Sequence, residues 1–152
     1  MNATATRVDV PDSAVADFSS DYADCFQVAA IPGQTAADWA GAALGGADGP
    51  FSRVVWQGLL GFDLSSSGTP GTLVGWPIRE DSPGRFVLES GGRLMAGRMV
   101  FELVDDAVRW TTSLRYHGST GRLVWAGAGP AHRRIAPRCL DQAHRRLSRL
   151  PA

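Results

Sequence analysis

Residues 130–150 read PAHRRIAPRCLDQAHRRLSRL, and this stretch decides the fold. If this stretch is helical, one face carries a mostly apolar stripe. The stripe consists of His132, Ile135, Ala136, Cys139, Leu140, Ala143 and Leu147. The arginines of the stretch fall elsewhere on the helix. A long amphipathic helix that closes a strand-rich chain buries its apolar stripe on a sheet. The sequence therefore predicts a C-terminal helix that grips a curved sheet, with a pocket between the two.

Strand signals separated by turn residues fill much of the chain before this helix. The predicted strands span residues 21–31, 72–79, 85–90, 93–104 and 107–117. In the last of them, Trp110, Thr112, Leu114 and Tyr116 face one way, and polar residues face the other. One apolar and one polar face indicate an antiparallel sheet with one wet side.

Helices and loops complete the expected order. Thr35 is a candidate N-cap for a helix over residues 36–44, and a second short helix is predicted over residues 50–60. Residues 63–71 are expected to form a flexible loop. Residues 1–16 are expected either to be loosely held or to contribute a strand over residues 7–10.

Residues 121–129 finish a strand or begin the last helix, and we favour the helix. The fold class is therefore α+β, in one domain over residues 1–152, with two short helices after the first strand.

Composition and charge exclude several classes of function. The chain has 152 residues, of which 44% are hydrophobic and 20% charged, as in an ordinary globular domain. Fifteen acidic residues balance fifteen basic ones, so we expect neither nucleic acid nor a membrane as a partner. All fifteen basic residues are Arg. The absence of Lys excludes Schiff-base catalysis through a lysine and the phosphate-binding loop that needs Gly-Lys-Ser/Thr.

The sequence predicts no metal, no cofactor and no export. Cys25 and Cys139 are too few for a disulfide framework, and His117, His132 and His144 share no usable ligand spacing. Met1 to Asp12 contain no signal-peptide run, and no stretch is apolar enough to span a membrane. We therefore expect a cytoplasmic protein with reduced thiols.

Two short motifs carry a family resemblance. Residues 21–26 read DYADCF, and residues 121–125 read GRLVW, followed by Pro130, His132 and Arg133. With the order of elements, these motifs resemble an uncharacterised bacterial branch of the START-like, or SRPBCC, helix-grip superfamily. That superfamily includes polyketide cyclases and lipid-binding carriers. The resemblance implies an apolar ligand held between the sheet and the C-terminal helix.

Three residues are candidates for acid–base chemistry in such a pocket. His132 lies on the inward stripe near the expected pocket mouth, and imidazole titrates near neutral pH. Asp24 follows Tyr22 on one face of a strand, where a buried carboxylate near His132 would make an acid–base pair. Tyr116 would orient a substrate by a hydrogen bond. The competing interpretation gives His132 and Asp24 purely structural roles.

Twelve residues are predicted to line the pocket because they are aromatic, apolar or small and fall on inward faces. They are Tyr22, Phe26, Trp76, Phe86, Met95, Met99, Phe101, Trp110, Thr112, Leu114, Ile135 and Cys139.

Three hypotheses for the function follow. The first is binding of a small hydrophobic or aromatic molecule. The second is an enzyme of the cyclase or dehydratase type that uses His132, Asp24 and Tyr116 without a cofactor. The third is an interaction module whose interior is filled by its own side chains and whose Arg-rich helix makes the contact. A monomer and a homodimer are both compatible with the sequence.

Overall fold

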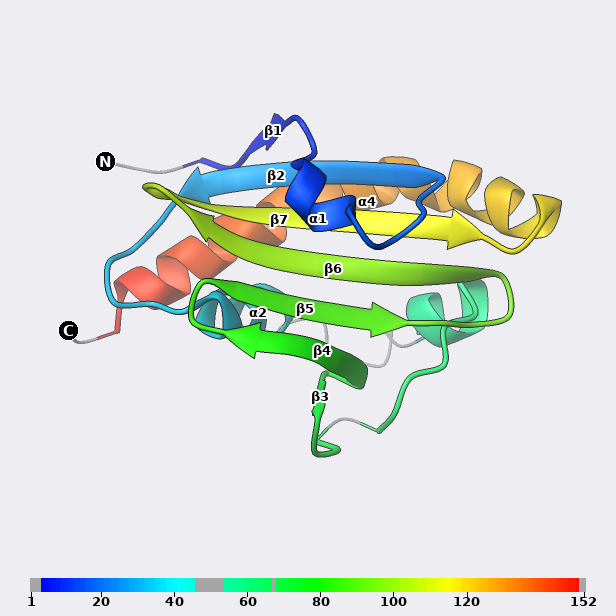
Figure 1. The fold of residues 1–152 in the computed structure, drawn as a ribbon, viewed down its shortest axis with the longest axis horizontal. Coiled ribbons are helices and arrows are strands. Elements are labelled where there is room, and N and C mark those ends of the chain that lie inside the picture. Colours follow the sequence, from blue (N-terminus) through cyan, green and yellow to red (C-terminus); the bar gives the residue numbers. More distant parts are fainter. Residues whose placement is uncertain (1–3, 46–53, 67, 151–152) are drawn as a thin grey trace.

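A computed structural model describes residues 4–45, 54–66 and 68–150 of the chain. It is an α+β fold in which one seven-stranded antiparallel sheet has the order β1-β2-β7-β6-β5-β4-β3 (Figure 1). The strands are β1 (Thr6–Val8), β2 (Tyr22–Ala29), β3 (Thr72–Leu73), β4 (Trp76–Ser82), β5 (Arg85–Ser90), β6 (Met95–Val104) and β7 (Ala107–Tyr116).

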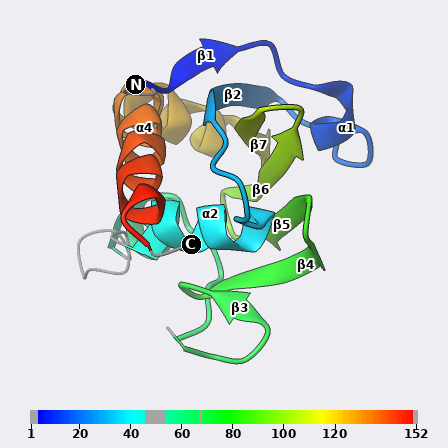
Figure 2. The ribbon, with the colours of Figure 1, turned by 90° about the vertical axis from the view of Figure 1, so that its left-hand side faces the viewer.

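The helical elements are α1 (Asp12–Val15), α2 (Ala36–Leu44), the π-helical segment η2 (Val54–Leu59) and α4 (Ser119–Ser148). The α2 and α4 helices lie against one face of the sheet, and α1 lies on the other (Figure 2). We call the face toward α2 and α4 the inner face. The α4 helix runs along β2 and β7 and also packs against α2.

Regular alternation explains the long strands at the centre of the sheet. The β6 and β7 strands pair without interruption from Met95 opposite Tyr116 to Val104 opposite Ala107. A two-residue connection joins them, in which Asp105 has a φ of 54°, a conformation that Asp tolerates better than most residues. Alternate residues of both strands therefore reach the inner face.

Local sequence signals also explain the two helices of the inner face. Thr35 caps α2 as predicted, because its side chain accepts from the Asp38 backbone N–H and Asp38 reciprocates. The α4 helix begins at Ser119, which confirms the helix favoured for residues 121–129. Gly121 is required near its start, since a Cβ there would lie 2.2 Å from the Leu94 carbonyl oxygen.

Several sequence predictions need correction or completion. The strand predicted over residues 72–79 is a hairpin of β3 and β4, because Val74 and Gly75 both adopt positive φ and form its two-residue turn. Residues 4–16 contain β1 and α1. Of the helix predicted over residues 50–60, residues 50–53 lie outside the described residues, and η2 covers most of the rest.

The outer face of the sheet is more buried than a wet face would be. Arg98 donates to Asp17 at 2.6 Å and to Glu89 at 3.0 Å, and its guanidinium stacks on Phe18. The side chain of Arg98 is only 7% exposed. Long-range ion pairs and the N-terminal segment therefore cover polar residues that the alternation alone assigns to solvent.

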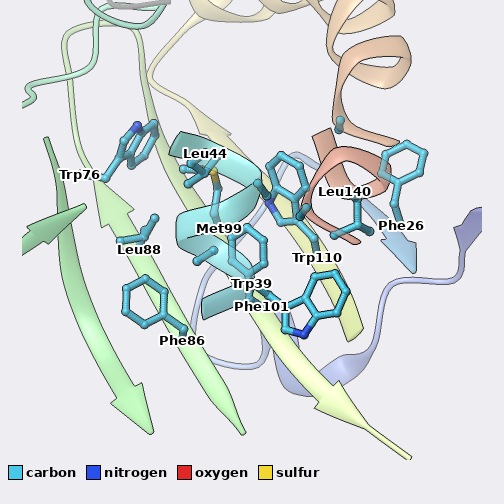
Figure 3. Packing of buried hydrophobic residues seen from close by; sticks show 14 of the residues in the cluster. Phe26, Trp39, Leu44, Trp76, Phe86, Leu88, Met99, Phe101, Trp110 and Leu140 are labelled. Carbon is cyan, nitrogen blue, oxygen red and sulfur yellow. The ribbon is translucent and has the colours of Figure 1, made fainter. Parts of the chain in front are cut away.

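The core lies between the inner face and the two helices that cover it, α2 and α4. Figure 3 shows Phe26, Leu88, Phe101 and Trp110 of the sheet meeting Trp39 and Leu44 of α2 and Leu140 of α4. Phe101 and Trp110 stack with 5.1 Å between their ring centroids. Aromatic side chains of neighbouring strands thus pack on one another within this core.

Candidate functional site

The structure brings two of the three predicted acid–base residues together. His132 Nε2 of α4 lies 3.2 Å from Asp24 Oδ2 and 3.4 Å from Asp24 Oδ1 of β2. The Asp24 side chain is fully buried, whereas that of His132 is 19% exposed. In the tautomer that suits this contact, the imidazole donates from Nε2 to the carboxylate, because a carboxylate oxygen accepts hydrogen bonds. The Nδ1 atom is then the acceptor of a neutral His132.

Tyr22 and Arg133 extend this pair into a chain of hydrogen bonds. The Tyr22 hydroxyl donates to Asp24 Oδ2 at 2.5 Å and accepts from Arg133 Nη1 at 3.2 Å. The Arg133 guanidinium also lies over the Tyr22 ring, 5.8 Å from its centroid. We call Tyr22, Asp24, Trp125, His132 and Arg133 the β2–α4 seam.

Burial raises the pKa of Tyr22 to about 12, and the hydrogen bond to Asp24 acts in the same direction. Tyr22 is therefore a neutral phenol at physiological pH. Its hydroxyl is already engaged by Asp24 and Arg133, so in this arrangement it orders the seam rather than transferring protons.

Trp125 closes the seam on its helix side. Its ring packs edge-on against Tyr22 and tilted against His132, with 5.2 Å between centroids in both pairs. The indole Nε1 is buried and has no hydrogen-bond partner among the described residues. Gly129, one turn further along α4, leaves room for this packing, because a Cβ there would lie 3.2 Å from that nitrogen.

Tyr116 lies outside the seam. Its ring stacks under the Arg122 guanidinium at 5.1 Å, and its backbone N–H donates to Asp21 Oδ2 at 2.8 Å. Burial raises the pKa of its hydroxyl. Within the part of the chain that the structure describes, no contact joins Tyr116 to Asp24 or His132, so the three predicted catalytic residues do not form one cluster.

Most predicted lining residues do meet on the inner face, where they form a continuous packed core. Eight of them are 6% exposed or less: Phe26, Trp76, Phe86, Met95, Met99, Phe101, Trp110 and Leu114. The wall of an empty, water-sized cavity would retain exposed surface, so these side chains largely fill the space beneath the helices. A ligand at this position has to displace side chains or shift α4.

The remaining four predicted residues differ in their surroundings. Thr112 is buried on the inner face, Tyr22 is half-buried in the seam, and Cys139 is half-buried against the core. Ile135 is 53% exposed, so its placement on the inward stripe was wrong. Because α4 lies near one edge of the sheet, only a narrow stripe of it is covered, and Ile135 falls outside that stripe.

The largely apolar inner core contains four buried indole N–H donors. The indole N–H groups of Trp39, Trp76, Trp110 and Trp125 are buried without a hydrogen-bond partner in the described parts of the chain. Buried indole N–H groups normally find an acceptor. Leaving one unsatisfied costs about 1–3 kcal/mol.

A separate open depression of about 620 Å³ lies beside the turn between β5 and β6. Gln57, Phe62, Asp63 and Arg93 are among its lining residues. The Phe62 ring also packs on Trp76, with 4.8 Å between centroids, so this depression adjoins the core from outside. None of the predicted site residues lines it.

Among residues 4–45, 54–66 and 68–150, no three His, Cys, Asp or Glu side chains converge as a metal site would require. In the same residues, no helix has the length and apolar character needed to cross a membrane.

The chain matches no protein-family model and no curated protein sequence. It is similar to one solved structure, protein Ms6760 from Mycobacterium smegmatis, with 13% sequence identity and a TM-score of 0.43. The alignment covers 97% of this chain and all of that one. The structure itself therefore defines the class of the protein: an α+β domain with an antiparallel curved sheet and a long C-terminal helix.

The sequence predicts no role for Trp125 or Gly129, and it offers Arg133 only as a structural salt-link partner of an aspartate in residues 21–24. Trp125 and Arg133 nevertheless lie in the quoted motifs. A signal was present, since the three residues follow one another at intervals of four and thus share one helix face. The predicted apolar stripe begins at Pro130, so it does not include the first half of α4, where this face turns toward β2.

Proposed function

We propose that this protein is a START-like helix-grip domain that binds a small hydrophobic or aromatic molecule between its sheet and α4. The four unpartnered indole N–H groups are the observation that carries the proposal. An interior that served stability alone would gain from replacing them by Phe, because each unsatisfied donor opposes folding. An aromatic ligand with acceptor atoms would both pack against these rings and accept from them.

The packed interior must open for the ligand, and α4 is the element suited to move. Pro130 and Pro137 lie inside this helix and cannot donate backbone hydrogen bonds. Gly127 and Gly129 weaken the same segment further. The half of α4 that lies over the seam can therefore bend away from β2 at a lower cost than an uninterrupted helix.

The β2–α4 seam is the proposed access point. Its Tyr22, His132 and Arg133 side chains are half-buried, so they face both solvent and the core. Ligand sites combine apolar walls with a few converging polar groups, and this seam adjoins such walls. Burial of the ligand would contribute roughly 25 cal/mol per Å² of apolar surface removed from water.

Prodan, a neutral naphthalene dye with a ketone oxygen, tests the proposal. We expect saturable binding with a blue-shifted emission, and Trp→Phe exchange at position 39, 76, 110 or 125 should weaken it at one or more of these positions. Loss of one neutral hydrogen bond corresponds to about threefold to tenfold in affinity. Trp56→Phe and Gln57→Ala are the controls, because Trp56 is not among the unpartnered donors and Gln57 lines the open depression. Absence of saturable binding would contradict the proposal, as would interior variants that all behave like the controls.

A cofactor-independent enzyme of the cyclase or dehydratase type is the second candidate, and the contact between Asp24 and His132 favours it. The buried carboxylate holds the Nε2 proton, which leaves Nδ1 as a base near the seam. A carrier releases its ligand unchanged, whereas this enzyme would release it cyclised or dehydrated. Mass spectrometry of a polyketone incubated with the wild type and with His132→Ala distinguishes the two.

A further inference from the structure

Among the described residues, the Arg133 guanidinium of the β2–α4 seam has no carboxylate within ion-pair distance, and Asp24 reaches it only through the Tyr22 hydroxyl. Arg85 and Arg98, which are also at least partly buried, lie within ion-pair distance of Glu102 and of Asp17 and Glu89, respectively. Arg133 is half-buried too, yet among the described residues it contacts only the neutral Tyr22 hydroxyl and ring. Its Nε and Nη2 atoms make no hydrogen bond to the described parts of the chain. A half-buried guanidinium with free donors favours an anionic partner.

A second donor converges on the same place. The Trp125 indole Nε1 is buried and unpartnered, and Trp125 is 5% exposed. The position that a Cβ of Gly129 would occupy lies 2.9 Å from Arg133 Nη1 and 3.2 Å from Trp125 Nε1. The two nitrogens therefore approach one side of α4 at the one residue whose missing side chain leaves them room.

The negative charge of Asp24 does not occupy this place. Its carboxylate is fully buried behind Tyr22 and His132, and both neighbours lie at hydrogen-bond distance from it. The Tyr22 hydroxyl is held in turn between Asp24 and Arg133, which fixes the guanidinium at the edge of the seam. The Tyr22 contacts thus hold the Arg133 guanidinium in place before a ligand binds.

We infer that the seam is an oxyanion site, and that the ligand is an aromatic or hydrophobic acid whose anionic group binds Arg133 and the Trp125 indole N–H. This inference rests on the proposed function, because it names the chemical class of the molecule whose apolar part enters the interior. Arginine binds carboxylates and sulfonates through paired N–H donors, and the indole adds a single neutral one. The apolar part of the acid lies against Trp125 and the core beyond it.

Two dyes with one ring skeleton test the inference. Anilinonaphthalene sulfonate carries an oxyanion, and N-phenylnaphthylamine lacks it. Arg133→Met should lower the affinity for the sulfonate at least about tenfold and change the affinity for the neutral dye by less than about twofold. Trp125→Phe keeps the ring contacts and should cost the sulfonate a smaller factor. Arg134→Met is the matched control, since it removes the same charge from the exposed neighbour.

Three other results of the dye titrations would overturn the oxyanion site or the proposed function. If the sulfonate loses no more affinity in Arg133→Met than in Arg134→Met, the oxyanion site is wrong while the proposed function stands. If Arg133→Met weakens both dyes equally, Arg133 only supports the fold and the inference is also overturned. If the wild type binds neither dye saturably, the proposed function fails and the inference fails with it. Circular dichroism of each variant confirms that it is folded.

Discussion

Arg133 and Trp125 flank Gly129 on one face of α4, and their nitrogens Nη1 and Nε1 would lie 2.9 and 3.2 Å from a Cβ at that glycine. The glycine at position 129 is therefore the sequence feature on which the proposed oxyanion site depends. A residue with no side chain allows a charged donor and a neutral donor to approach each other beside β2.

Gly129→Ala should separate binding from stability. The added methyl group displaces the end of the Arg133 side chain, so the affinity for anilinonaphthalene sulfonate should fall severalfold. Gly→Ala exchange within a helix stabilises it by up to about 1 kcal/mol, which offsets the crowding of Trp125. Gly127→Ala is the control, because nothing lies within 4 Å of its added Cβ. Equal dye affinities in the two variants would argue against the convergence of donors at Gly129.

The seam should show energetic coupling between Asp24 and His132. A double-mutant cycle of Asp24→Asn and His132→Gln, followed by urea unfolding, should give an interaction energy of about 1 kcal/mol or more. The same cycle with His144→Gln should be additive within about 0.5 kcal/mol, since His144 packs against Trp39 instead. Additivity in both cycles would mean that the contact contributes nothing to folding.

Tyr22 should make folding sensitive to alkaline pH. Its pKa is 10.0 in an unconstrained phenol and about 12 in the folded protein. The folded state therefore binds the phenolic proton more tightly, so this contribution is complete below pH 10 and is lost as the pH rises toward 12. The free energy of unfolding should fall more steeply over this interval in the wild type than in Tyr22→Phe. Parallel profiles for the two proteins would refute the assignment.

Two apolar residues of α4 should differ sharply in their effect on stability. Leu140 is completely buried, so Leu140→Ala should lower the free energy of unfolding by about 2–5 kcal/mol. Ile135 is 53% exposed, and Ile135→Ala should change it by less than about 0.5 kcal/mol. Denaturant titration of both variants measures the difference. A large decrease in the free energy of unfolding for Ile135→Ala would mean that Ile135 is buried after all.

Periodicity predicted the elements that local sequence determines. The bounds of β5 match the expected strand, and α2 begins after the capping residue Thr35 as predicted. The positive φ of Val74 was not predictable, because a β-branched residue rarely adopts that conformation and nothing nearby signals a turn except Gly75. The hairpin of β3 and β4 was therefore read as one strand.

The other features of the fold and of the site depend on tertiary contacts between residues that lie far apart in the sequence. Burial of Arg98 on the outer face depends on Asp17, which lies 81 residues earlier in the chain. The position of α4 near the edge of the sheet decides that Leu140 is covered and Ile135 is not. For the site, the sequence supplied Asp24 and His132 as separate candidates. Their contact, and the participation of Tyr22, Trp125 and Arg133, depends on how α4 lies along β2.

The indole N–H resonances of isotopically labelled protein test the central claim most directly, since the chain contains five tryptophans and each gives one such signal. Titration with prodan should shift signals of the four buried donors, Trp39, Trp76, Trp110 and Trp125, and leave that of Trp56 largely unchanged. Shifts that saturate together would show the interior taking up a ligand. A spectrum that does not change, or one in which Trp56 alone responds, would contradict binding between the sheet and α4.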